Sequence, residues 1–200
     1  MSLSKKNKIT IRIIISIIAL GLLVYLFKIV YHPGIQLPAN FINSREQAAL
    51  VSQKIVELTT RTANKISSLN VPSVASNPNE ALLLIRDARE TNSEAYNQAF
   101  ELSQNLQKLG ESLSQIKDTY SQQTAYEALA TELSLVSQFI IYTQNLNSFL
   151  DKLSVFINAG SSANQMAVKD ALAEVNDRAN AINKLNQDFL SKMADFDNSL

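Results

Sequence analysis

The sequence predicts an all-α protein in which one N-terminal transmembrane helix precedes an antiparallel bundle of three to four long helices with coiled-coil-like seams. Three observations lead to this prediction. One stretch near the N-terminus is apolar over the length of a membrane span. Apolar residues then recur at alternating steps of three and four, the period of packed helices. Gly and Pro, the two strongest helix breakers, number only four each among 200 residues.

The first element is a signal-anchor helix, predicted over residues 9–31. Its centre, residues 13–27, is uncharged, and Arg12 and Lys28 lie near its ends, where long side chains can reach the head groups. About 20 residues rising ~1.5 Å each cover a hydrocarbon core of about 30 Å. The side chains expected to contact lipid are Ile13, Ile14, Ile15, Ile17, Ile18, Leu20, Leu22, Leu23, Val24, Leu26 and Phe27.

The charges around this segment predict its orientation. Lys5, Lys6, Lys8 and Arg12 precede the apolar centre, and the first acidic residue of the chain is Glu46. The positive-inside rule then places a short basic tail, residues 1–8, in the cytoplasm and the C-terminal domain outside. Because the chain has no Asn-X-Ser/Thr sequon, a bacterial plasma membrane is favoured over a glycosylating secretory pathway.

The apolar segment has two other interpretations. A cleaved signal peptide has a similar basic and apolar start, but the run continues as KIVYHP (residues 28–33) without a small-X-small cleavage site. A buried core helix is disfavoured, because neighbouring helices could not cover every face of so Ile-rich a rod. An uncleaved anchor is therefore the favoured interpretation.

A juxtamembrane linker is predicted over residues 32–43, which hold two of the four prolines. The bundle follows over residues 44–200, and its first helix is expected at about 45–69. Ser44 with Gln47 fits a capping box at the start of this helix. Its apolar positions include Ala48, Val51, Ile55, Leu58, Ile66 and Leu69.

The second helix is expected over residues 78–118. Asn77 as N-cap, Pro78 at the first helical position and Glu80 at the third form a strong start signal. Its seam follows the three–four alternation without a break: Ile85, Ala88, Asn92, Ala95, Ala99, Leu102, Leu106, Leu109, Leu113, Ile116 and Tyr120.

A phase break in the seam then predicts a tight turn near residues 118–123 and a third helix over 122–157. The alternative is a single continuous rod over 78–157, which would extend roughly 120 Å at ~1.5 Å per residue. Additional apolar residues off the third seam predict a central helix with neighbours on more than one side. The third seam is Ala125, Leu129, Glu132, Val136, Phe139, Thr143, Leu146, Leu150, Leu153 and Ile157.

Gly160 is expected to end the third helix as a left-handed C-cap, and Ser162 with Gln165 to open a fourth over 163–198. Short connections predict antiparallel neighbours, with the C-terminus returning towards the bilayer. Because the first helix is shorter than the rest, one end of the bundle is expected to expose an apolar strip. The fourth seam is Val168, Leu172, Val175, Ala179, Ile182, Asn186, Phe189, Met193, Phe196 and Leu200.

Catalytic chemistry is not indicated anywhere in the sequence, and no cofactor or metal site is predicted. The chain has no Cys, and its one His, His32, lies at the membrane boundary, so thiolate and histidine-based sites are excluded. Residues 195–199 resemble the start of a calcium loop but lack the distal Glu, and predict a frayed helix end. Beyond the anchor, 13 basic residues face 18 acidic ones, which disfavours nucleic acid as a partner.

Four polar residues interrupt the seams: Asn92, Glu132, Thr143 and Asn186. A buried polar residue at such a position often specifies register or partner number. A second interpretation is that each residue is solvated at an edge of the seam. A third is that the four residues line a polar ligand cavity.

These features favour a structural or protein-interaction scaffold of the cell envelope rather than an enzyme. Its expected partners are the lipid bilayer and a protein partner or a second copy bound through the helical seams. The alternative is a ligand-binding or sensory ectodomain, which would need a partner membrane subunit because the cytoplasmic tail is only about eight residues long.

Overall fold

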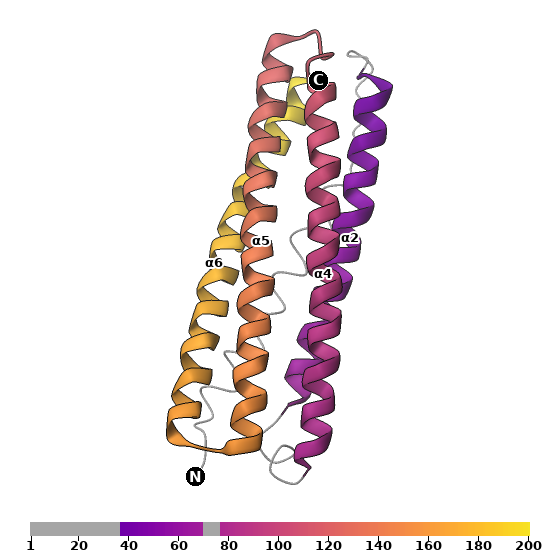
Figure 1. The fold of residues 1–200 in the computed structure, drawn as a ribbon. Helices are drawn as coiled ribbons and strands as arrows, with labels where there is room; N and C mark the ends of the chain where they lie inside the picture. Colours follow the sequence, from indigo (N-terminus) through magenta and orange to yellow (C-terminus); the bar gives the residue numbers. More distant parts are fainter. Residues whose placement is uncertain (1–36, 70–76) are drawn as a thin grey trace.

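The computed structural model describes residues 37–69 and 77–200, and within them the chain forms four helices and no strand. The helices are α2 (Ala39–Ser68), α4 (Pro78–Leu113), α5 (Thr119–Ala159) and α6 (Ser162–Ser199). They run alternately up and down as long neighbouring rods, as Figure 1 shows. The pairs that pack closely are α2 with α4, α4 with α5, and α5 with α6. The predicted all-α helical bundle is confirmed for this part of the chain, and the continuous rod is excluded.

The two ends of the bundle differ in what they contain. The start of α2, the α4–α5 turn and the C-terminal end of α6 meet at one end, which we call the near end (Figure 1). The α5–α6 connection marks the opposite end, which we call the far end. The predicted anchor and the basic residues before it lie outside the described residues. Within residues 37–69 and 77–200, no helix combines the length and apolar character needed to cross a bilayer.

Helix α2 begins earlier than predicted, at Ala39, directly after Pro38. The predicted linker to residue 43 is therefore too long, and Ser44 lies inside the helix instead of capping it. The Ile42 N–H already donates to the Pro38 carbonyl at 3.1 Å. The reason is tertiary: Phe41, seven residues before Ala48, continues the apolar face of α2 and is 3% exposed.

The start of α4 follows the predicted pattern. Asn77 is the N-cap and Pro78 the first helical residue. The Glu80 N–H donates to Asn77 Oδ1 at 3.3 Å, and Asn77 Nδ2 donates to Glu80 Oε2 at 3.0 Å. The first bond satisfies a backbone donor that the first turn of a helix leaves free, and the second joins the two side chains.

The turn between α4 and α5 comes earlier than predicted, because α4 ends at Leu113 and α5 begins at Thr119. Asp118 caps α5, accepting from the Ser121 N–H at 2.7 Å and the Ser121 hydroxyl at 2.9 Å. The backbone and hydroxyl hydrogen bonds from Ser121 hold the pKa of Asp118 below its ordinary value. Tyr120, predicted to end the second seam, instead lies in the first turn of α5 and is 64% exposed.

The connection between α5 and α6 is nearly as predicted. Gly160 is the C-cap of α5, and its N–H donates to the Phe156 carbonyl at 2.9 Å, but its φ of 18° lies outside the left-handed region. Ser161, one residue before the predicted Ser162, caps α6 by accepting from the Asn164 N–H at 3.1 Å.

The main core runs through the bundle and follows the predicted seams, and Val56 and Leu135 form a small second cluster. Towards the far end this core thins: no residue between 151 and 170 is buried. Seam residues at 2% exposure or less occur on each of the four helices: Ala48, Leu58, Ile85, Ala88, Asn92, Ala95, Ala99, Leu102, Leu106, Leu113, Phe139, Thr143, Leu150, Ala179, Ile182 and Phe196.

Candidate functional site

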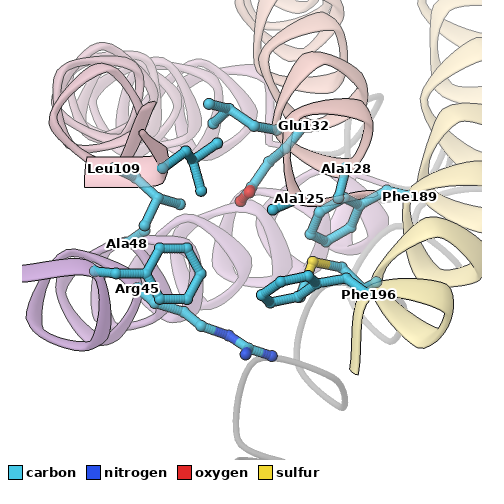
Figure 2. Close-up of a pocket in the computed structure, with 12 residues that line it drawn as sticks. Arg45, Ala48, Leu109, Ala125, Ala128, Glu132, Phe189 and Phe196 are labelled. Atoms are coloured by element: carbon cyan, nitrogen blue, oxygen red, sulfur yellow. The ribbon is translucent and has the colours of Figure 1, made fainter. Parts of the chain in front are cut away.

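A small cavity lies between the four helices close to the near end, and its volume is about 20 Å³. Each of the four helices contributes to its lining, and the cavity is partly open to solvent (Figure 2). Two of its lining residues are charged, Arg45 from α2 and Glu132 from α5. The rest of the lining is apolar and includes Ala48, Leu109, Leu113, Ala125, Phe189 and Met193.

Glu132 is a buried acid on the seam of α5. It is 4% exposed, and its Oε1 has no hydrogen-bond partner among the described residues. Figure 2 shows its carboxylate directed into the space between the helices. Burial raises the pKa of Glu132 to about 7, although the positive charge of Arg45 acts in the opposite direction. Glu132 therefore changes its charge near neutral pH.

Arg45 and Asp197 form a buried ion pair between α2 and α6. Arg45 Nη2 lies 3.2 Å from Asp197 Oδ1, and Nη1 donates to the same oxygen at 3.3 Å. The guanidinium carbon lies 6.0 Å from the centre of the Phe196 ring, and Phe196 meets Phe41 edge-on at 5.7 Å between centroids. An aromatic contact and an ion pair thus join the first turns of α2 to the last turns of α6.

A second polar cluster joins α4 to α5 in the middle of the bundle. Asn92 Nδ2 donates to the Thr143 carbonyl at 2.7 Å and to Asn147 Oδ1 at 2.9 Å. The Thr143 hydroxyl donates to the Ile140 carbonyl at 2.7 Å. Asn92 is 2% exposed and Thr143 is fully buried. This cluster is satisfied internally, so it stabilises one alignment of α4 against α5.

The four polar seam residues are therefore all buried, and none lies wet at an edge. The structure brings Asn92 and Thr143 together, and places Glu132 in a separate site with Arg45. Asn186 on α6 is 9% exposed, and its Oδ1 has no hydrogen-bond partner in the described part of the chain. The hydroxyl of Ser52 is fully buried and likewise unpaired there.

Sequence reasoning missed the Arg45–Asp197 pair. The sequence predicts a frayed helix end at residues 195–199, but α6 stays helical to Ser199 and Asp197 is 9% exposed. The sequence of α2 does indicate that Arg45 is buried. Arg45 lies four residues after Phe41 and three before Ala48, so it occupies a seam position. A polar seam residue there is the same kind of signal that singled out Glu132.

The chemistry open to this site is limited to proton exchange and hydrogen bonding. Glu132 has no second acid or nucleophile beside it in the cavity lining. Among residues 37–69 and 77–200 there is no group of three or more His, Asp or Glu that could hold a metal ion. Comparison of the chain with protein-family models, curated proteins and solved structures gave no match.

Proposed function

We propose that the chain is a membrane-anchored, extracytoplasmic helical-bundle protein that acts as a structural or protein-interaction component of the cell envelope. One observation carries the interaction role. The far end contains 16 successive residues without a charge, residues 153–168, between Lys152 and Lys169. None of them is buried, and Val155 and Met166 are 51% and 65% exposed. We call residues 153–168 the uncharged tip.

The placement of the tip fits a scaffold held at a membrane. Residue 37, where the described structure starts, lies at the near end, only a few residues after the predicted anchor at 9–31. Helix α5 has 41 residues and spans roughly 60 Å at ~1.5 Å per residue. An anchor at the near end would therefore present the uncharged tip about one bundle length away from the bilayer.

The composition of the tip favours a protein partner over a lipid surface. The two flanking lysines are offset by Asp151 and Asp170, so the tip offers no net positive charge to anionic head groups. Asp151 is also paired with Arg89 at 2.7 Å. Protein interfaces are depleted in Lys, Asp and Glu and enriched in Met at their centres, which matches an uncharged tip with an exposed Met166.

Site-specific photo-crosslinking in the native membrane tests this proposal. A photoreactive residue replaces Val155 or Met166 at the tip. In the matched controls it replaces Leu50 on α2 or Phe100 on α4, which are 54% and 56% exposed. We expect a discrete adduct from the tip positions and none from the controls. Adducts from all four positions, or from none, would contradict an interaction surface at the tip.

The mass of the adduct distinguishes the kind of partner. An increment equal to the chain's own 22.1 kDa identifies a second copy, and any other discrete increment identifies a different protein. The membrane topology has its own test: a reporter that is active only in the cytoplasm, fused after Leu200, should be inactive. An active reporter would overturn the proposed orientation.

The second candidate is a ligand-binding or sensory ectodomain that works through a partner membrane subunit. The buried Glu132 side chain favours it, because Glu132 lines a cavity and its Oε1 has no hydrogen-bond partner among the described residues. The cavity volume of about 20 Å³ argues against an organic ligand there, because small-molecule pockets usually occupy about 300 Å³ or more. The scaffold function is therefore the better supported of the two.

A further inference from the structure

The cavity at Glu132 has an unpaired acceptor in its lining. Glu132 Oε1 is buried and has no hydrogen-bond partner among the described residues. Figure 2 shows the carboxylate directed into the space between the helices, whereas the guanidinium of Arg45 points away from it. Buried polar side chains in folded proteins are nearly always hydrogen-bonded, to protein or to ordered water. An ionised carboxylate oxygen is an acceptor only, so it matches a partner that can donate a hydrogen bond.

The size of the cavity restricts that partner. A volume of about 20 Å³ exceeds the roughly 10–15 Å³ that one buried water needs, and is far below the volume of an organic ligand. We propose that the cavity is a binding site for a single water molecule, held by a hydrogen bond to Glu132 Oε1. This inference does not depend on the membrane anchor or on the uncharged tip.

The charges around the cavity favour water over a cation. The charged group that lines the cavity with Glu132 is Arg45 from α2, which is paired with Asp197 from α6. Helix α4 contributes two apolar lining residues, Leu109 and Leu113. Hard cations need several oxygen ligands. The lining supplies only one carboxylate, and the positive charge of Arg45 opposes a second cation.

Water also suits both charge states of Glu132. Because burial brings the pKa of Glu132 to about 7, the carboxyl group is present in both forms near neutral pH. A water molecule donates to the ionised carboxylate and accepts from the protonated carboxyl. A fixed donor such as an ammonium group would satisfy only the ionised form.

The test fills the cavity and follows the titration of Glu132. The full chain in detergent micelles is titrated by ¹³C NMR, with the Glu132 carboxyl signal assigned by its loss in Glu132→Gln. Ala128, 2% exposed and lining the cavity, is changed to Val to exclude the water; the matched control is Ala130→Val, on the exposed face of the same helix. Retained helical circular dichroism shows that each variant folds.

We expect the pKa of Glu132 to rise by about one unit or more in Ala128→Val, because the ionised form loses a charge-assisted hydrogen bond. The pKa should not move in Ala130→Val. An unchanged pKa in a folded Ala128→Val would overturn the proposal. If that variant does not fold, crystallographic density of the unmodified chain decides. A water peak within hydrogen-bond distance of Glu132 Oε1 supports the site, and an empty cavity or a multiply coordinated cation refutes it.

Discussion

Replacing Glu132 with Gln is expected to change how the stability of the bundle depends on pH. In the folded chain the pKa of Glu132 is raised from 4.5 to about 7 by burial. A carboxyl group with a raised pKa in the folded state stabilises the fold fully below its unfolded pKa, and this contribution disappears as pH rises through the folded pKa. The stabilisation by Glu132 is therefore lost between about pH 4.5 and pH 7.

The size of the effect follows from the same two values. At about 1.4 kcal/mol for each pKa unit, the change from 4.5 to about 7 corresponds to about 3 kcal/mol between the acid and alkaline plateaus. Gln keeps the shape of the side chain but does not titrate in this range. The free energy of unfolding of Glu132→Gln minus that of the unmodified chain should therefore rise by about 3 kcal/mol from acid to alkaline pH.

Urea unfolding followed by circular dichroism, repeated from about pH 4.5 to pH 8.5, measures this difference. The other carboxylates are the same in both proteins, so the subtraction removes their contribution. Glu127→Gln, at an exposed position of the same helix, is the control and should show no such pH-dependent difference. A flat difference for Glu132→Gln, or one that falls with pH, would refute the claim that burial controls the titration of Glu132.

Three further predictions concern the interior. Arg45→Met leaves Asp197 buried without Arg45 and should lower the free energy of unfolding by about 3–5 kcal/mol. The double variant Arg45→Met with Asp197→Leu should regain most of this stability. A double variant as unstable as the single one would contradict a stabilising Arg45–Asp197 ion pair. Asn92→Leu removes one buried and one half-buried hydrogen bond and should cost about 1–3 kcal/mol. Asn186→Leu should be neutral or stabilising, because Asn186 Oδ1 has no hydrogen-bond partner among the described residues. Equal losses in urea unfolding would contradict this contrast. Leu106→Ala, at a fully buried position, should cost about 2–5 kcal/mol in the same assay, and a loss below about 0.5 kcal/mol would place Leu106 outside the core.

The helical seams were predictable because they depend on spacing alone. Steps of three and four place residues on one face of a helix whatever its neighbours are, and Leu102, Leu106 and Ile182 are accordingly buried. The start of α2 was not predictable in this way. Pro38 indicates a loop locally, and the helix begins directly after it because Phe41 packs against Phe196, near the other end of the chain.

The candidate site was predictable only in part. Glu132 was recognised as a polar seam residue, but its burial depends on which side chains of three other helices lie opposite. The Arg45–Asp197 pair joins residues 152 positions apart, and no local pattern reports such a contact. The shape of the cavity likewise follows from how Ala125, Ala128 and the facing aromatic side chains meet, which is decided by the assembled bundle.

The opposite positions of residue 37 and the uncharged tip have a mechanical consequence. Residue 37 lies at the near end and residues 153–168 at the far end. Tension between a membrane attachment at the first and a partner bound at the second would act parallel to the helices. Such a force would load the α2–α4 interface in shear, because it would pull α2 lengthwise along α4. The side-chain contacts along the whole interface would then bear the force at the same time. A sideways pull would peel the same contacts apart one turn at a time.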